Sequence, residues 1–130
     1  MNDRDPVFVI DDEESVRAAL TKLLRAIGVP SETFPSAQAF LDSYTSDRRG
    51  CLLVDVRMPG MSGLDLIEEL QRRDNRLPAI VMTGHTDEAA LERLEALQPI
   101  GFLEKPFTLA ELKQTLERWH PPAGTPSADR

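Results

Sequence analysis

Residues 51–55 read CLLVD, and this short stretch indicates the fold class. Its apolar run is typical of a buried β-strand, and the run ends on the carboxylate of Asp55. Three further apolar runs are followed by polar residues in the same way: VFVI at 7–10 by Asp11 and Asp12, IVM at 80–82 by Thr83, and FL at 102–103 by Lys105 after one intervening residue. Because ligand sites of open α/β folds lie at the carboxyl ends of parallel strands, these five polar side chains are predicted to converge there.

Length and composition are those of one ordinary globular domain. The chain has 130 residues, of which 41% are hydrophobic and 28% charged. No apolar run approaches the ~20 residues of a membrane helix, and the amino terminus lacks the pattern of a signal peptide. The single cysteine, Cys51, cannot form an internal disulfide. We therefore expect a cytoplasmic protein without a membrane partner.

The formal net charge of −7 argues against a nucleic-acid surface on this domain. Such surfaces are built from clustered lysine and arginine, whereas the basic residues here are scattered along the chain. We expect no direct contact with nucleic acid.

Apolar runs alternate with segments of helical period. Predicted strands cover 7–10, 32–34, 51–55, 79–83 and 100–103. Predicted helices run from Glu13 to a stop at Gly28, from the N-cap Ser36 through Tyr44, from Leu64 through Leu70, from Glu88 to Leu97, and from Thr108 through Trp119. This alternation predicts a doubly wound parallel sheet covered on both faces by helices. Residues 1–119 form the predicted domain, and the proline-rich residues 120–130 a flexible tail or the start of a linker.

The predicted cluster suits a divalent cation and a phosphoryl group. Three converging carboxylates need a counter-charge, which Mg²⁺ supplies. Asp55 is the candidate nucleophile, since a carboxylate can form an aspartyl phosphate, and Lys105 and Thr83 offer an ammonium and a hydroxyl to phosphoryl oxygens. The alternatives are that each aspartate caps a helix or turn, that Lys105 is a surface lysine, and that Thr83 simply ends a strand. For Asp12, capping of the first helix is compatible with a metal role.

Four motifs carry a family resemblance: VIDDE at 9–13, LVDVRMPGMSGL at 53–64, PAIVMTGH at 78–85 and FLEKPF at 102–107. In this order and spacing they resemble the receiver domain of two-component response regulators, over residues 6–119. The MTGH and FLEKPF stretches are most similar to nitrogen-fixation regulators, whose full-length members carry a helix-turn-helix output domain.

The resemblance implies a flavodoxin-like three-layer sandwich with strand order 2-1-3-4-5. It also implies that Asp55 accepts a phosphoryl group from a sensor histidine kinase. Asp12, Asp55 and the backbone carbonyl of Arg57 would then bind Mg²⁺, with Asp11 acting directly or through water. Thr83 and Lys105 would hold the phosphoryl oxygens.

Further roles follow from the same resemblance. Phe102 matches the aromatic switch position, for which core packing is the alternative, and Lys105-Pro106 matches a cis peptide. Arg57 and His85 would flank the path of the hydrolytic water and modulate dephosphorylation. The kinase would dock on the first helix and the loop after the last strand. Output would use the surface of the fourth and fifth helices and the strand between them. A homodimer formed on phosphorylation is also expected.

The chain departs from the family at Gln98-Pro99, where a small pair is usual. Since proline lacks an N–H and stiffens the backbone, we expect an altered end of the fourth helix. Two other classes of protein compete with a regulatory domain. A phosphatase or phosphotransferase would carry a general acid two residues after Asp55, where Arg57 stands, and a flavodoxin-like cofactor binder would carry a glycine-rich loop after the first strand. We therefore expect a phosphoacceptor domain and not a turnover enzyme.

Overall fold

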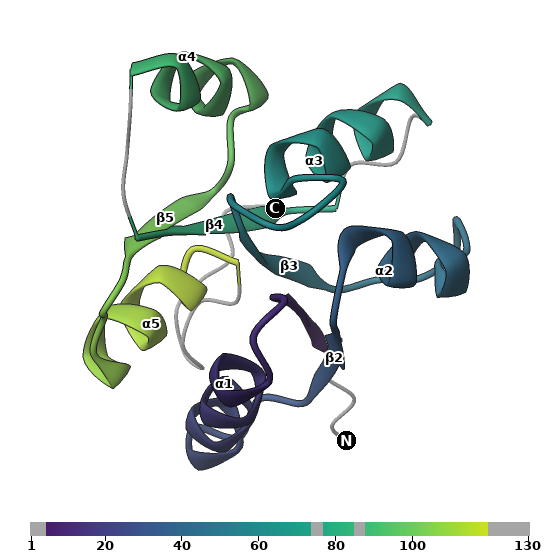
Figure 1. Ribbon diagram of the computed structural model, residues 1–130. Helices are drawn as coiled ribbons and strands as arrows, with labels where there is room; N and C mark the ends of the chain where they lie inside the picture. Colours follow the sequence, from purple (N-terminus) through teal and green to yellow (C-terminus); the bar gives the residue numbers. More distant parts are fainter. Residues whose placement is uncertain (1–4, 74–76, 85–87, 120–130) are drawn as a thin grey trace, which may run out of the picture.

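The computed structural model describes residues 5–73, 77–84 and 88–119. Five parallel strands form one sheet with the order β2-β1-β3-β4-β5, which confirms the predicted topology (Figure 1). The strands are β1 (Val7–Ile10), β2 (Ser31–Phe34), β3 (Cys51–Asp55), β4 (Ala79–Thr83) and β5 (Gly101–Glu104). The helices are α1 (Glu14–Ala26), α2 (Ala37–Ser43), α3 (Gly63–Arg72), α4 (Glu88–Leu97) and α5 (Leu109–Leu116).

Helices cover both faces of the sheet, with α1 and α5 on one side and α2, α3 and α4 on the other (Figure 1). Alternate residues of each buried strand supply the two cores, because successive side chains point to opposite faces. On β3, Leu53 packs with the α1 and α5 side chains, whereas Leu52 and Val54 pack with those of α2 and α3. Both faces of β3 are buried, which explains its uninterrupted apolar sequence.

Local sequence signals set several element boundaries. Ser36 caps α2 by accepting a hydrogen bond from the Ala39 amide. Thr108 forms a capping box with Glu111 at the start of α5. Gly28 has φ +77 beyond the end of α1, a conformation that favours glycine. The last strand begins at Gly101, one residue later than predicted, and Trp119 lies beyond the end of α5.

At Gln98-Pro99 the chain leaves α4 and the strand pairing that follows is intact. Gln98 takes a left-handed conformation, with φ 55, and its amide donates to the carbonyls of Leu94 and Glu95. Ile100 still donates to the Ala79 carbonyl at 2.8 Å, so β5 joins the sheet next to β4. None of the helices in the described ranges combines the length and apolar character needed to cross a membrane.

Candidate functional site

The polar residues at the strand ends converge as the sequence predicts. Ile10 of β1 pairs with Val54 of β3, so the next residues, Asp11 and Asp55, stand at the same edge of the sheet. One oxygen each from Asp11, Asp12 and Asp55 lies within 4.8 Å of the other two. Asp11 is fully buried, Asp55 is 8% exposed, and Asp12 is exposed. The cluster therefore opens to solvent on the Asp12 side.

Lys105 links the two buried carboxylates. Its Nζ lies 3.0 Å from Oδ2 of Asp11 and 3.0 Å from Oδ2 of Asp55. Its backbone amide donates to the carbonyl of Thr83 at 2.7 Å, which ties the loop after β5 to the end of β4. The interpretation of Lys105 as an ordinary surface lysine is therefore wrong.

Burial and hydrogen bonding have opposing effects on the pKa values of Asp55 and Lys105. Burial raises the pKa of Asp55, and the hydrogen bond from Lys105 lowers it without reversing the shift. Burial lowers the pKa of Lys105, but the hydrogen bonds to Asp11 and Asp55 outweigh it, so the pKa lies above the usual value. The environment thus favours the cationic form of Lys105 and disfavours ionisation of Asp55.

Backbone amides hold the remaining carboxylate oxygens. The Glu13 amide donates to Oδ1 of Asp11 at 2.9 Å, and the Arg57 amide donates to Oδ1 of Asp55 at 3.1 Å. The contact at the start of α1 is therefore made by Asp11, where the sequence suggested Asp12. Both buried carboxylates are fixed through both oxygens, and Asp12 remains the exposed member of the cluster.

Thr83 and Phe102 occupy contrasting environments. Thr83, at the end of β4, is 3% exposed, whereas Phe102 on β5 is 41% exposed. The neighbouring Leu103 faces the core instead, in keeping with strand alternation. Plain core packing of Phe102, the alternative to a switch role, is therefore wrong. The Lys105-Pro106 peptide bond is cis, as expected.

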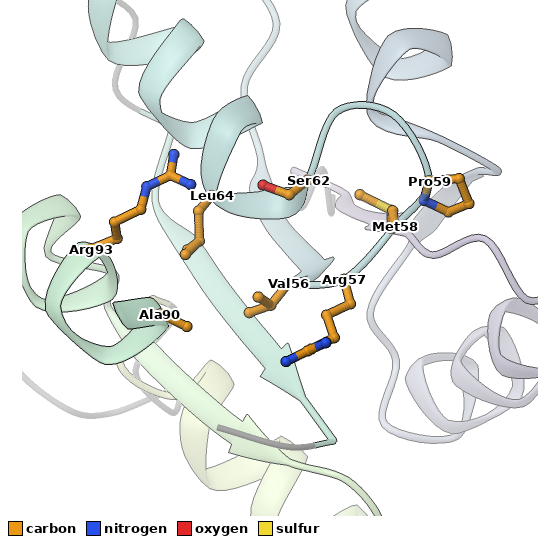
Figure 2. Close-up of a pocket in the computed structure, with 8 residues that line it drawn as sticks. All are labelled: Val56, Arg57, Met58, Pro59, Ser62, Leu64, Ala90 and Arg93. Atoms are coloured by element: carbon orange, nitrogen blue, oxygen red, sulfur yellow. The ribbon is translucent and has the colours of Figure 1, made fainter. Parts of the chain in front are cut away.

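Arg57 lies in the loop between β3 and α3, at one side of a groove that Figure 2 shows. The groove separates this loop from α4, and its lining combines two arginines with small or apolar residues: Val56, Arg57, Met58, Pro59, Ser62, Leu64, Ala90 and Arg93. The other predicted modulator, His85, lies outside the described residues.

Two supporting residues had no role predicted from the sequence, although Arg17 and Gly63 both belong to the stretches that resemble the family. Arg17 reaches back from α1, and its Nη1 donates to the Asp11 carbonyl at 2.7 Å. Gly63 starts α3 against the Asp55 peptide, and a Cβ there would lie 2.3 Å from the Asp55 carbonyl oxygen. The predicted strand and helix that carry Asp11 and Arg17 are consecutive, which is a signal for their contact. Nothing in the sequence indicated the close approach of Gly63 to Asp55.

The donor set fits a hard divalent cation. Mg²⁺ prefers oxygen ligands and uses few protein carboxylates together with water. The three clustered oxygens supply such ligands, and the exposed position of Asp12 leaves a route from solvent. The same edge holds the Lys105 ammonium for an anionic group. The arrangement can accordingly bind a cation and a phosphoryl group side by side.

Comparison with known proteins agrees with this geometry. A family model described as the response regulator receiver domain matches residues 7–117. Over 102 residues the chain is 47% identical to the transcriptional regulatory protein FixJ of Azorhizobium caulinodans, covering 78% of this chain and 48% of that protein. It is 42% identical over 106 residues to nodulation protein W of Bradyrhizobium diazoefficiens, covering 82% and 47%. The chain thus spans about half the length of these relatives.

Solved structures give the same assignment. The crystal structure of FixJ-N matches with a TM-score of 0.82 and 36% identity, covering 91% of this chain and 94% of that one. The chemotaxis protein CheY4 of Vibrio cholerae matches with a TM-score of 0.80 and 25% identity, covering 89% and 98%. The chain belongs to the response regulator receiver-domain family.

Proposed function

We propose that this domain is a phosphorylation-dependent switch in which Asp55 accepts a phosphoryl group from a phosphohistidine of a sensor histidine kinase. The observation that carries the proposal is the Lys105 ammonium, held 3.0 Å from both Asp11 and Asp55 at the edge of the sheet. A lysine in this place can bind the Asp55 carboxylate before the transfer and the negatively charged phosphoryl oxygens after it.

In the transfer step, one Asp55 oxygen forms a bond to phosphorus while the bond from phosphorus to the donor imidazole nitrogen breaks. The electron pair of that bond remains on the imidazole. Lys105 and the Thr83 hydroxyl then bind phosphoryl oxygens, and the Arg57 amide keeps the Asp55 carboxylate oriented. Positioning and charge stabilisation supply most of the rate in such transfers.

Mg²⁺ is the proposed cofactor, held by Asp11, Asp12, Asp55 and the backbone carbonyl of Arg57. When bound, it neutralises charge that develops on the transferring group. The support is the three-carboxylate cluster and its match to the preferences of a hard cation.

Switching would start from Thr83 and Phe102. Phosphorylation adds negative charge beside Lys105 and biases an equilibrium between two arrangements of the neighbouring chain. Thr83 would move toward the phosphoryl group and the exposed Phe102 ring would turn inward, while Pro106 keeps Lys105 in place. Arg57 and His85 are the proposed modulators of dephosphorylation.

The domain would act by regulated contacts and not as a turnover enzyme. The proposed partners are the kinase, a second copy on phosphorylation, and a helix-turn-helix output domain, since several relatives are named transcriptional regulators. The division at residue 119, with a flexible segment after it, and a cytoplasmic location stay predictions from the sequence.

Intact-mass analysis after incubation with acetyl phosphate and Mg²⁺ tests the proposal. We expect wild type to gain one phosphoryl group and Asp55→Asn to gain none. Asp42→Asn, which removes an exposed carboxylate on α2, is the matched control and should behave as wild type. Equal labelling of Asp55→Asn and wild type would refute the assignment, and so would an unlabelled wild type.

A further inference from the structure

A branched ion pair connects α4 to α3 beside the groove of Figure 2. The Arg93 guanidinium extends from α4 toward α3. One of its nitrogens donates to Oδ1 of Asp65 at 2.9 Å and to Oε1 of Glu68 at 3.3 Å. Two carboxylates on successive turns of α3 therefore share one cation on α4.

Apolar and polar contacts both join these helices. Among the described side chains of α4, Leu94 is buried in the same cluster as Ile67 of α3, and the partly buried Leu97 packs against that cluster, while Leu91 is 40% exposed. At the far end of the pair, Nε2 of Gln71 donates to the Leu97 carbonyl at 3.1 Å. Polar contacts to α3 add to this packing at two points along α4, Arg93 and the Leu97 carbonyl.

Asp65 connects the Arg93 ion pair to the start of α3, which lies next to the phosphoacceptor site. Its Oδ2 accepts from the Ser62 amide at 3.1 Å, while Ser62 Oγ accepts from the Asp65 amide, which forms a capping box at the start of α3. Gly63, the residue after Ser62, packs directly on the Asp55 peptide. Its amide donates to the Val56 carbonyl at 3.1 Å. One Asp65 oxygen thus accepts from the Ser62 amide at the start of α3, close to Asp55. The other oxygen binds Arg93 of α4.

We propose that Arg93 is a positioning residue that fastens α4 to the α3 terminus behind Asp55 in the unphosphorylated protein, and so restrains the phosphorylation switch. The inference rests on the proposed function. The bridge is present in the unphosphorylated arrangement. In this proposal phosphorylation favours an arrangement without it, so removing the bridge lowers the free-energy cost of the change. The hydrogen-bonding pattern of Asp65 supports this, because the Ser62 amide and then Arg93 hold the pKa of that carboxyl below its usual value.

Three variants test the proposal. Arg93→Gln removes the cation, Arg93→Lys keeps it on a different head group, and Arg72→Gln is the matched control, because Arg72 makes its ion pair with Glu69 inside α3. Amide hydrogen exchange of residues 88–97 without a phosphodonor reports how firmly α4 is held. The initial rate of phosphorylation by acetyl phosphate with Mg²⁺ reports the coupling to the switch.

For Arg93→Gln we expect exchange in α4 and the initial phosphorylation rate each to rise about two- to five-fold, the size expected for partly exposed ion pairs. Arg93→Lys should be intermediate and Arg72→Gln unchanged. An Arg93→Gln protein that matches Arg72→Gln in exchange would overturn the positioning role, and faster exchange with an unchanged rate would overturn the restraint on the switch. Failure of the proposed function looks different, because wild type itself would then take up no phosphoryl group.

Discussion

Replacing Lys105 by methionine removes a cation that two buried carboxylates share, and we expect the fold to lose stability at neutral pH. Lys105 Nζ lies 3.0 Å from an oxygen of Asp11 and from one of Asp55. Asp11 is 0% exposed and Asp55 8%, so bulk water compensates for the lost charge only in part. Methionine keeps an unbranched apolar stem, and the substitution therefore tests the charge more than the packing.

The magnitude follows from the burial of the three groups. Breaking a buried ion pair by removing one partner costs about 3–5 kcal/mol, because the other charge stays buried without compensation. The Lys105 side chain is 25% exposed, which screens part of the attraction. We expect a loss of about 2–3 kcal/mol in unfolding free energy at pH 7, equivalent to a Tm decrease of roughly 6–10 °C for a domain of this size.

The pH dependence has a definite sign. Burial raises the pKa of Asp55, so ionising this group costs more in the folded than in the unfolded protein. Its contribution to stability therefore falls as pH rises from the unfolded pKa, ~3.9, through the folded pKa. Without Lys105 the interval between the unfolded and the folded pKa of Asp55 widens. The difference in unfolding free energy between Lys105→Met and wild type should therefore be largest near pH 7 and shrink on acidification. The raised pKa of Lys105 keeps its own contribution fully present below ~10.4, the pKa of an unfolded lysine.

Urea unfolding followed by circular dichroism at pH 7 and pH 5, without divalent cations, measures both effects. Lys113→Met, at an exposed position on α5, is the matched control. Added Mg²⁺ should restore part of the loss in Lys105→Met, because the cation replaces the missing counter-charge. If Lys105→Met were as stable as Lys113→Met at pH 7, or if its deficit grew on acidification, the idea of a shared buried cation would be wrong.

Three further outcomes are expected. Gly63→Ala should destabilise the fold by about 1–3 kcal/mol in urea unfolding, since the new Cβ would lie 2.3 Å from the Asp55 carbonyl oxygen, whereas Gly84→Ala, with nothing within 4 Å, should change little. Gln98→Gly should stabilise by roughly 0.5–1 kcal/mol in the same assay, because φ 55 is unfavourable for glutamine; a loss of stability would contradict this account of the turn. Mg²⁺ should raise the Tm of wild type more than that of Asp55→Asn, and equal increases in the two proteins would argue against a metal at Asp55.

Much of the fold and of the site could be predicted because the relevant signals are local. The apolar run before Asp55 and the VFVI run before Asp11-Asp12 each indicate a buried strand with a polar end. Parallel pairing then brings those ends to the same edge without further information. The N-caps at Ser36 and Thr108 are equally local, since the side chain bonds an amide three residues ahead.

Contacts between distant parts of the chain could not be predicted in the same way. The approach of Gly63 to the Asp55 peptide depends on the path of the intervening loop. The Arg93 bridge to Asp65 joins residues 28 apart on two helices whose relative rotation the sequence does not encode locally. The exposure of the Phe102 side chain is also a tertiary property. Strand alternation predicts that Phe102 and Leu103 face opposite sides of the sheet, but it does not predict which of the two sides other elements cover.

The sequence by itself determined the fold class and the set of groups at its functional edge, because strand and helix periods and the order of polar strand ends are written along the chain. Only the tertiary structure decided how those groups interact. Lys105 reaches Asp11 across 94 residues and Asp55 across 50, and no local pattern could indicate these two contacts between buried charges. The physical reason is that burial and Coulomb energies depend on distances in space, which the chain settles only when its strands, helices and loops pack together.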